Sequence, residues 1–289
     1  MVRCVITGLV GIVMLLGCEG RDDTQKRQGP SGEDFIPVVC VGSIEPGPWP
    51  SLEPCQFGGI VSVWINANPV LVADQSRFQY IGPFCRPGSN TVEVRGRLEQ
   101  AVDLGIYEQA GDGRVLARRI LSVGPRQEGD PIEPFDVKLK MRYRLPLFDG
   151  TRLDAWESEQ IEQEARSTLR GLCDLFERKD WEQAAKRVLA GTQLYRKARG
   201  WTEMELRDKE KELASAYASL TDPIRFCAED QYRYLVGEQA VLVYAVEEGR
   251  PCRIIDIPLP ENAVDLSIGQ LWLAHVRGQW MIWHVWSTP

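Results

Sequence analysis

The only two histidines of the chain, His275 and His284, are its clearest candidates for acid–base chemistry. Both lie in the last predicted hairpin, where an Arg277-Gly278 turn would place residues 275 and 280 opposite each other. Imidazoles buried among aromatic rings can acquire shifted pKa values and help to shape a ligand pocket. With regular alternation, one face of this hairpin would carry Leu271, His275, Trp280, Ile282, His284 and Trp286.

Other signatures of catalysis are missing from the sequence. It contains no GxSxG nucleophile elbow and no GxxxxGKS phosphate loop. The HExxH and GxGxxG motifs and the spacing of a calcium loop are also absent. With two histidines and no clustered carboxylate motif, we expect no catalytic transition metal and no cofactor.

The hairpin belongs to a segment, residues 152–289, that reads as helices followed by strands. Apolar residues recur every three to four positions from Ile161 to Phe176, which predicts an amphipathic helix. Asp180 can cap a second helix, and the capping box Thr202-x-x-Glu205 opens a third. Strands are predicted over residues 232–236, 240–246, 254–257, 271–276 and 280–286. This half is therefore expected to be an α+β domain.

Helices followed by a curved meander that ends in xGxWxIxxxW resemble the NTF2-like (SnoaL-like) cone fold. LFERKDWEQAAKRVLAG resembles the family's early helix pair, and VRGQWMIWHVW its closing hairpin. The resemblance implies a site inside the cone, with His284 as a base, Trp280 and Trp286 as aromatic walls, and Tyr232 or Tyr244 as hydrogen-bond donors. The family's acid–base pair is not visible in this sequence. The simpler interpretation, which we favour, is that these side chains are core residues.

Residues 35–147 are predicted to form an all-β domain. Residues 61–66 and 91–95 alternate between apolar and polar side chains, and the turns NANP and RPGSN separate strands. This spacing predicts a β-sandwich. The run VWINANPVL…RFQYIGPFCRPGSNTVEVR resembles part of the galactose-binding-like jelly rolls of glycosidases. That resemblance implies a sandwich and, more weakly, carbohydrate binding with Trp49 or Trp64 as a stacking platform.

The N-terminal residues have the pattern of a targeting signal. Arg3 precedes an apolar run over residues 5–16, which is shorter than the ~20 residues that cross a bilayer. The Leu15-Leu16-Gly17-Cys18 sequence at its end resembles the lipobox of bacterial lipoproteins. The resemblance implies that residues 1–17 are removed as a signal peptide and that Cys18 is lipidated, for example with palmitate. The alternative is an ordinary secretory signal with a chance cysteine.

A lipid at Cys18 would fix where the protein lies. Two or more acyl chains anchor a protein stably, and lipoproteins of this type usually carry several. Glu19 follows Cys18, so the aspartate of the enteric inner-membrane retention signal is absent. We expect an extracytoplasmic location in the cell envelope, at the outer membrane in a diderm host. The polar residues 18–34 would be a flexible tether.

The net charge of −7 and the pI of about 5.1 exclude some partners. An acidic body does not attract phosphate backbones, so we expect no nucleic-acid binding. It would also be repelled by anionic headgroups, so membrane attachment should depend on the lipid.

Six cysteines remain when Cys4 and Cys18 are set aside from the eight in the chain. An even number in an oxidising compartment suggests disulfides. We expect the pairs Cys55–Cys85 and Cys227–Cys252, with Cys40 and Cys173 free; the alternative is that all six are thiols. The absence of a CxxC pair gives no support to a zinc ribbon or a thioredoxin-like redox site.

These patterns predict a multi-domain envelope lipoprotein, with an all-β sandwich followed by an α+β NTF2-like domain. The most favoured function is non-catalytic: the binding of an envelope protein or a small apolar ligand. Homodimerisation through the C-terminal sheet is a further expectation. The alternatives are an isomerase-like or hydrolase-like enzyme that uses the pocket around His284, and carbohydrate or cell-wall binding through the sandwich.

Overall fold

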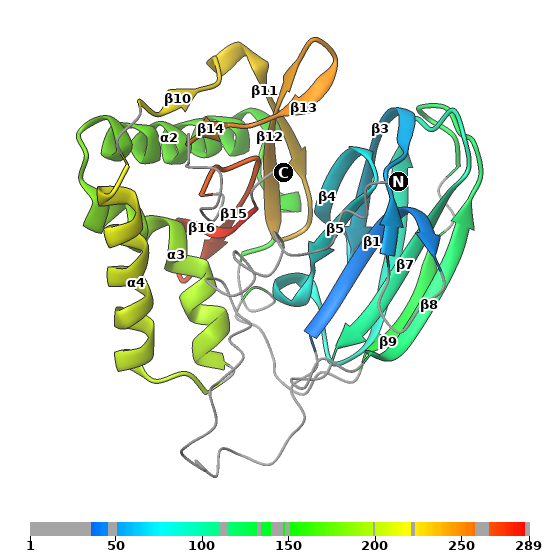
Figure 1. Cartoon of the computed structure of the whole chain (residues 1–289), viewed down its shortest axis with the longest axis horizontal. Helices are drawn as coiled ribbons and strands as arrows, with labels where there is room; N and C mark the ends of the chain where they lie inside the picture. Colours follow the sequence, from blue (N-terminus) through cyan, green and yellow to red (C-terminus); the bar gives the residue numbers. More distant parts are fainter. Residues whose placement is uncertain are drawn as a thin grey trace.

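A computed structural model describes residues 36–45, 51–109, 115–131, 134–139, 147, 151–198, 200–220, 223–257 and 266–286. The predicted signal, lipobox and tether, together with Trp49, lie outside these residues. The described part is mostly β, with three α-helices and several antiparallel sheets, none of which closes on itself (Figure 1). None of the described helices combines the length and the apolar character that a membrane span requires.

The first half of the described chain forms two antiparallel sheets. One runs in the order β2-β1-β7-β8, with β5 also paired to β1, and the other runs in the order β4-β3-β6-β9. The strands are β1 (Ile36–Glu45), β2 (Ser51–Glu53), β3 (Gln56–Ile65), β4 (Asn68–Gln75), β5 (Arg77–Tyr80), β6 (Gly88–Gly96), β7 (Val102–Gln109), β8 (Val115–Val123) and β9 (Phe135–Leu139).

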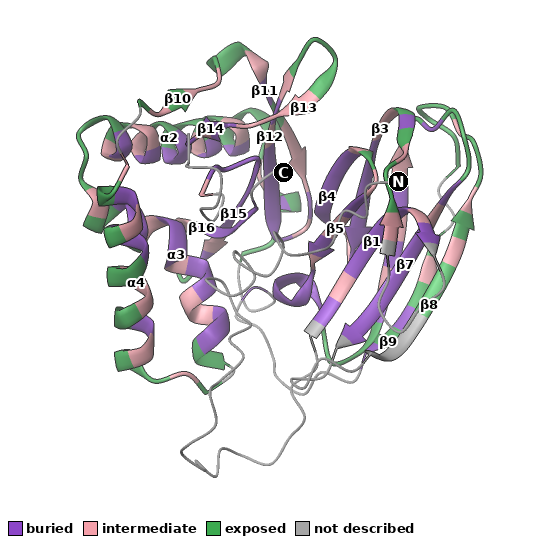
Figure 2. Ribbon diagram, viewed as in Figure 1, coloured by how far each residue is buried: buried purple, intermediate pink, exposed green. Residues whose placement is uncertain are grey.

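These two sheets face each other across a common core. Val39 and Ile106 of the first sheet and Val63 and Val94 of the second belong to one cluster of buried side chains. In β3, β6 and β7, alternate residues belong to this cluster, as the period of two in the sequence predicts. The arrangement is that of a β-sandwich, and we use this name for residues 36–139 below (Figure 2).

The predicted turns of the sandwich are confirmed in part, because β4 already begins at Asn68 and β6 at Gly88. Asn66 and Ala67 both have positive φ, at 50° and 59°, and connect β3 to β4 as a two-residue hairpin turn. The Asn66 Nδ2 donates to Asn90 Oδ1 at 2.8 Å, and Asn66 Oδ1 accepts from the Thr91 N–H at 3.2 Å. The two predicted turns are thus fastened to each other by asparagine side chains.

The second half begins with helices α2 (Ser158–Glu177), α3 (Trp181–Ala198) and α4 (Glu203–Ala218). The predicted capping box is present at the start of α4, where Thr202 and Glu205 exchange hydrogen bonds. The strands that follow are β10 (Arg225–Phe226), β11 (Tyr232–Val236), β12 (Ala240–Glu247), β13 (Arg250–Cys252), β14 (Ile255–Asp256), β15 (Gln270–Val276) and β16 (Gln279–Trp286). The main sheet runs in the order β11-β12-β15-β16, with β13 also paired to β12.

This main sheet is covered on both faces. Val241, Leu271 and Ile282 pack with the helices in one buried cluster. Leu242 and Trp272, on the other face, belong to the same cluster as the core of the sandwich. The two halves therefore share a core, and the sandwich occupies the face of the sheet opposite the helices (Figure 1).

The six described cysteines are all free in the structure. The predicted Cys55–Cys85 bond is not formed: the Cys85 thiol is buried and donates to the Ile81 carbonyl at 3.2 Å. Cys55 instead accepts a hydrogen bond from Gln100 Nε2 at 3.4 Å. The Cys227 and Cys252 Sγ atoms are in contact at 3.7 Å without a bond.

Candidate functional site

The C-terminal hairpin has the predicted turn and pairing at its tip. Arg277 and Gly278 have φ values of 54° and 79°, and His275 pairs with Trp280. Two successive positive φ values match the right-handed twist of the flanking strands. The sequence therefore predicted correctly which residues face each other next to the turn.

Further along the hairpin, a β-bulge moves the side chains beyond it to the opposite face of the sheet. The register shifts between Trp272 and Leu273: Leu273 pairs with Ile282, but Trp272 pairs with His284, so Trp283 is the extra residue. One extra residue reverses the alternation of side chains beyond it. The prediction of one shared face is therefore wrong, because Ile282 lies on the helix side and Trp286 on the sandwich side.

Helix α3 approaches this bulge at Gly191. A methyl group added at Gly191 would collide with the backbone of Trp283, which cannot move without disturbing the sheet. The glycine thus lets the helix lie directly on the bulged strand.

We expect Gly191→Ala to lower the free energy of unfolding by about 1–3 kcal/mol, because the core would be overpacked. Gly171→Ala in α2 is the matched control, since its added methyl would meet only the flexible guanidinium of Arg187, at 2.7 Å. That change should be neutral or stabilise by up to about 1 kcal/mol, the usual gain in a helix. Urea denaturation of both variants measures the difference, and equal effects would contradict the close approach.

His284 is buried at the seam between the two halves, with 3% of its surface exposed. Its ring lies 5.3 Å from that of Trp272, 6.2 Å from Phe84 and 6.3 Å from Tyr80, measured between centroids. Neither ring nitrogen has a hydrogen-bond partner within the described part of the chain. Burial lowers the pKa of His284 to about 3. A general base works best with a pKa near the working pH, so this imidazole is a weak proton acceptor at neutral pH.

His275 lies on the other face of the sheet, where its side chain and its backbone make contacts that support the fold. Its Nδ1 is 2.8 Å from Thr151 Oγ1, and its ring centroid is 5.1 Å from that of Trp156 and 5.7 Å from that of Trp280. The Thr151 N–H also donates to the His275 carbonyl at 3.0 Å. These contacts fasten the segment before α2 to the tip of the hairpin.

The two tyrosines of the predicted pocket also lie on opposite faces. Tyr232 packs in the helix-side cluster, and its hydroxyl donates to the Cys227 carbonyl at 3.0 Å. Burial raises the pKa of Tyr232 well above its usual value. Tyr244 packs against the sandwich-side cluster, and burial raises its pKa too. The sheet therefore divides the predicted site into Tyr232, His275, Trp280 and Ile282 on one side and Tyr244, His284 and Trp286 on the other.

Between the helices and the sheet, apolar side chains from both are buried in one cluster. Phe176 of α2 packs edge-on against Tyr217 of α4, with centroids 4.9 Å apart. Leu172, Val188 and Leu273 are fully or almost fully buried in the same cluster. Figure 2 shows the inward sides of the helices and the strands beneath them as buried. Of the polar side chains that the sequence singled out on this side of the sheet, the Tyr232 hydroxyl donates to the Cys227 carbonyl and His275 pairs with Thr151.

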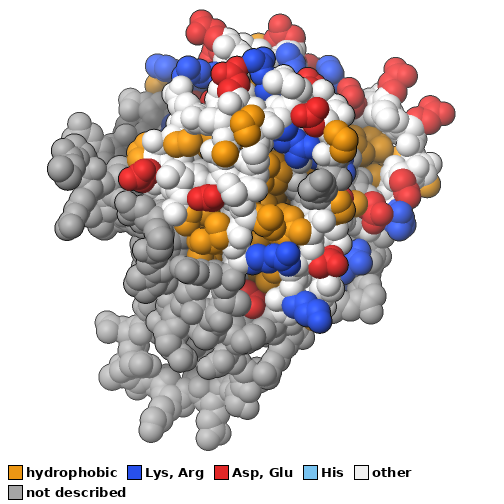
Figure 3. Space-filling model, turned by 90° about the vertical axis from the view of Figure 1, so that its right-hand side faces the viewer, with side chains coloured by type: hydrophobic (Ala, Val, Ile, Leu, Met, Phe, Trp, Pro, Cys, Tyr) orange, Lys and Arg blue, Asp and Glu red, His pale blue; other side chains and the backbone are white. Residues whose placement is uncertain are grey.

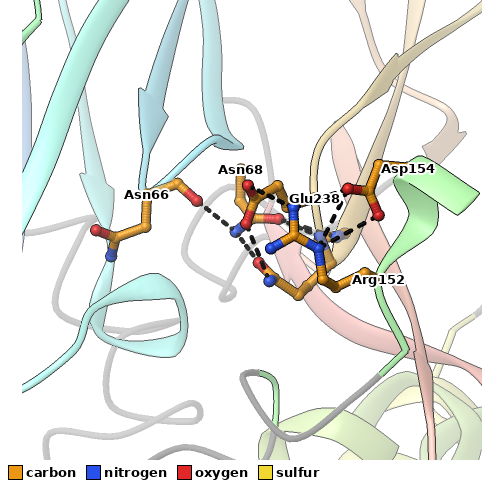
Figure 4. Close-up of polar contacts among 7 residues, drawn as sticks. Asn66, Asn68, Arg152, Asp154 and Glu238 are labelled. Carbon is orange, nitrogen blue, oxygen red and sulfur yellow. Dashed lines mark hydrogen bonds and ion pairs between the residues drawn. The ribbon is translucent and has the colours of Figure 1, made fainter.

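A polar junction between the halves is the feature that sequence reasoning missed (Figure 4). Asn68 Oδ1 accepts hydrogen bonds from the backbone N–H groups of Gln239, at 2.8 Å, and Ala240, at 3.0 Å. Asn68 Nδ2 donates to Gln239 Oε1 at 2.7 Å. The Glu238 N–H donates to the Ala67 carbonyl at 3.0 Å. The β3–β4 turn is thus fastened to the β11–β12 turn.

Charged side chains extend this junction to the surface. Arg152 Nη2 lies 2.7 Å from Asp154 Oδ2 and 3.0 Å from Glu238 Oε1. The hydrogen bond from Arg152 lowers the pKa of the Asp154 carboxyl. Arg152 and Asp154 are 57% and 54% exposed, so this ion pair contributes little to stability.

The seam between the halves is further fixed by side-chain bonds to the backbone of the sandwich. Trp272 Nε1 donates to the Pro69 carbonyl at 2.7 Å, and Trp283 Nε1 donates to the Pro83 carbonyl at 3.1 Å. The Gln270 amide both accepts from the Val72 N–H, at 3.1 Å, and donates to the Val72 carbonyl. Buried tryptophan and glutamine side chains are thereby satisfied across the interface.

Trp64 is not presented as a stacking platform. It is 5% exposed, and the Arg95 guanidinium lies over its ring, 3.8 Å from the centroid. Its Nε1 donates to Ser62 Oγ at 2.9 Å. A sugar could stack on this ring only if Arg95 moved away.

The surface carries apolar side chains in small groups. Figure 3 views the body from the sandwich side, where hydrophobic side chains are interrupted by positive and negative ones. Among the large hydrophobic residues that the structure describes, only Ile120 and Met204 are strongly exposed. A partner protein would therefore meet a mixed surface.

Known proteins give no further constraint on this site. A comparison with protein-family models finds no match, and searches of curated proteins and of solved structures find none either. The interpretation of the molecule therefore depends on its own residues and geometry.

Proposed function

We propose that this chain is a lipid-anchored envelope protein whose folded body is a non-catalytic interaction module. The observation that carries the non-catalytic part is the division of the candidate pocket between two faces of one sheet. His284, the candidate base, is buried in the seam with a pKa of about 3, where it packs with aromatic rings. Its role there is to fill the interface.

The C-terminal half is proposed to be an NTF2-like domain. Three helices precede an antiparallel sheet and pack on one face of it, in agreement with that fold. The apolar side chains buried together under the helices favour a protein partner over an apolar ligand held inside the cone. Because the sandwich covers the other face, a homodimer through this sheet would have to use its edges, β11 or β16.

The lipid anchor is supported by the sequence around Cys18. We expect Cys18→Ser to abolish incorporation of an alkynyl palmitate analogue, because the variant lacks the thiol that would carry the acyl chain.

Cys4→Ser is the matched control for this experiment, because it changes a cysteine inside the predicted signal peptide. That variant should keep the label. A Cys18→Ser protein that still took up the label would contradict lipidation at Cys18.

A further inference from the structure

The pair Cys227 and Cys252 is the one described place where two thiols touch. Their Sγ atoms are 3.7 Å apart, and both residues are half-buried. Cys227 directly follows β10, and its backbone N–H donates to the Ile254 carbonyl at 3.0 Å. Cys252 ends β13 and pairs with Ala245 of β12. Backbone hydrogen bonds thus hold both cysteines in place, and rotation of their side chains can bring the sulfurs to bonding distance.

We propose that Cys227 and Cys252 form a disulfide when the protein meets a thiol oxidant, so that the two-stranded sheet β10–β14 is fastened covalently to the edge of the main sheet. The bond would close a loop that contains β11, β12 and β13. These strands form the edge of the sheet next to the β3–β4 turn of the sandwich. The bond therefore stabilises the part of the main sheet against which the sandwich is docked.

The oxidant belongs to the class of disulfides, such as glutathione disulfide or an envelope thiol–disulfide oxidoreductase. The Cys227 thiolate attacks one sulfur of the oxidant, which forms a mixed disulfide and expels a thiolate. The Cys252 thiolate then attacks the Cys227 sulfur, and the second thiolate leaves. The two cysteines lose two protons and two electrons, and the oxidant is reduced to two thiols.

The surroundings favour Cys227 as the first nucleophile. Burial raises the pKa of both thiols, and that of Cys252 reaches about 12 because burial and its contact with Cys227 act together. For Cys227, hydrogen bonds from Cys252 and from the Ala228 N–H oppose the shift. Since the thiolate is the reactive species, oxidation at neutral pH should be slow and should become faster at alkaline pH.

The other cysteines provide internal controls. Cys40 and Cys85 are buried in apolar surroundings, which raises the pKa of each thiol. Cys55 is half-buried like the proposed pair, but among the described residues no second thiol touches it. Cys55→Ser is therefore the matched control for Cys252→Ser.

Peptide mapping of the full chain tests the pairing directly. The protein is incubated with excess glutathione disulfide at alkaline pH, alkylated, digested with trypsin and analysed by mass spectrometry. Cleavage after Arg225, Arg233 and Arg253 places the two cysteines in separate peptides, 226–233 and 234–253. We expect these peptides to be linked after oxidation and separated by dithiothreitol.

The stability of the oxidised protein gives a second readout. We expect its thermal midpoint to rise by roughly 5–10 °C over that of the reduced protein, because the closed loop restricts the unfolded chain. Cys252→Ser should lose both the linked peptide and the shift, whereas Cys55→Ser should keep both. If both cysteines can still be alkylated after the incubation with oxidant, or if Cys227 is linked to another cysteine, the pairing is overturned.

The assay uses purified protein and therefore does not depend on where the protein lies in the cell. Formation of the disulfide in cells, by contrast, rests on the proposed envelope location. A pair that links in the purified protein but is reduced in cells would overturn the proposed location and leave the pairing intact. A pair that fails to link in the purified protein would overturn the pairing and leave the location untouched.

Discussion

Asn68→Ala should lower the free energy of unfolding by about 2–4 kcal/mol. The Asn68 side chain is fully buried and accepts hydrogen bonds from the backbone N–H groups of Gln239 and Ala240. It also donates to the Gln239 side chain. Alanine would leave these groups buried without partners in the seam between the halves. Urea denaturation followed by tryptophan fluorescence measures the loss, and the shared core predicts a single transition.

Arg152→Ala is the matched control at the same junction. Arg152 is 57% exposed, and its contacts with Asp154 and Glu238 lie in solvent, so its removal should change stability by no more than about 0.5 kcal/mol. If Asn68→Ala lowers the free energy of unfolding as little as Arg152→Ala does, water takes the place of the missing amide. In that case the junction would not be what holds the two turns together.

The sequence predicts the local features of this fold well because each depends on neighbouring residues. The capping box of Thr202 and Glu205 needs only four consecutive positions, and it forms as expected. Asn66 adopts a positive φ, which asparagine tolerates well, so the residue types of this turn are enough to predict it. The pairing of His275 with Trp280 follows from the Arg277-Gly278 turn in the same way.

The bulge at Trp283 could not be predicted in this manner. Residues 280–286 read WMIWHVW, and this almost continuous apolar run gives no local sign of where an extra residue interrupts the alternation. The extra residue, Trp283, lies where helix α3 approaches the strand at Gly191, and these two residues are far apart in sequence. The prediction of one shared face therefore places His284 and Trp286 on the wrong side of the sheet.

The seam between the halves is also a long-range feature. Asn68 and Gln239 come from different halves of the chain, so no local pattern connects them. One signal was present in the sequence: residues 240–243, AVLV, and 271–274, LWLA, are apolar at consecutive positions, and the structure buries all of them. Strands that are apolar on both sides indicate a sheet covered on both faces, and this pattern could have revealed that the sandwich packs there.

Acid should weaken the folded protein through His284, and this is the second large effect that we expect. The folded state holds the imidazole neutral with a pKa of about 3, whereas an unfolded histidine titrates near 6.5. Between these values the unfolded chain binds more protons, so stability is fully present above about pH 6.5 and is lost as the pH falls toward 3. The full contribution is about 4–5 kcal/mol, of which about 2 kcal/mol is lost by pH 5.

His284→Phe separates this effect from the titration of carboxyl groups, because phenylalanine keeps a ring among Trp272, Phe84 and Tyr80 but binds no proton. Urea denaturation at pH 7.5 and pH 5 should show that the wild-type protein loses about 2 kcal/mol more than the variant. His275→Phe should retain the wild-type pH dependence, since His284 is unchanged. If His284→Phe and the wild-type protein lose the same stability, the imidazole is already solvated or partnered in the folded state. The seam would then be open to water, and His284 would again be a candidate for proton transfer.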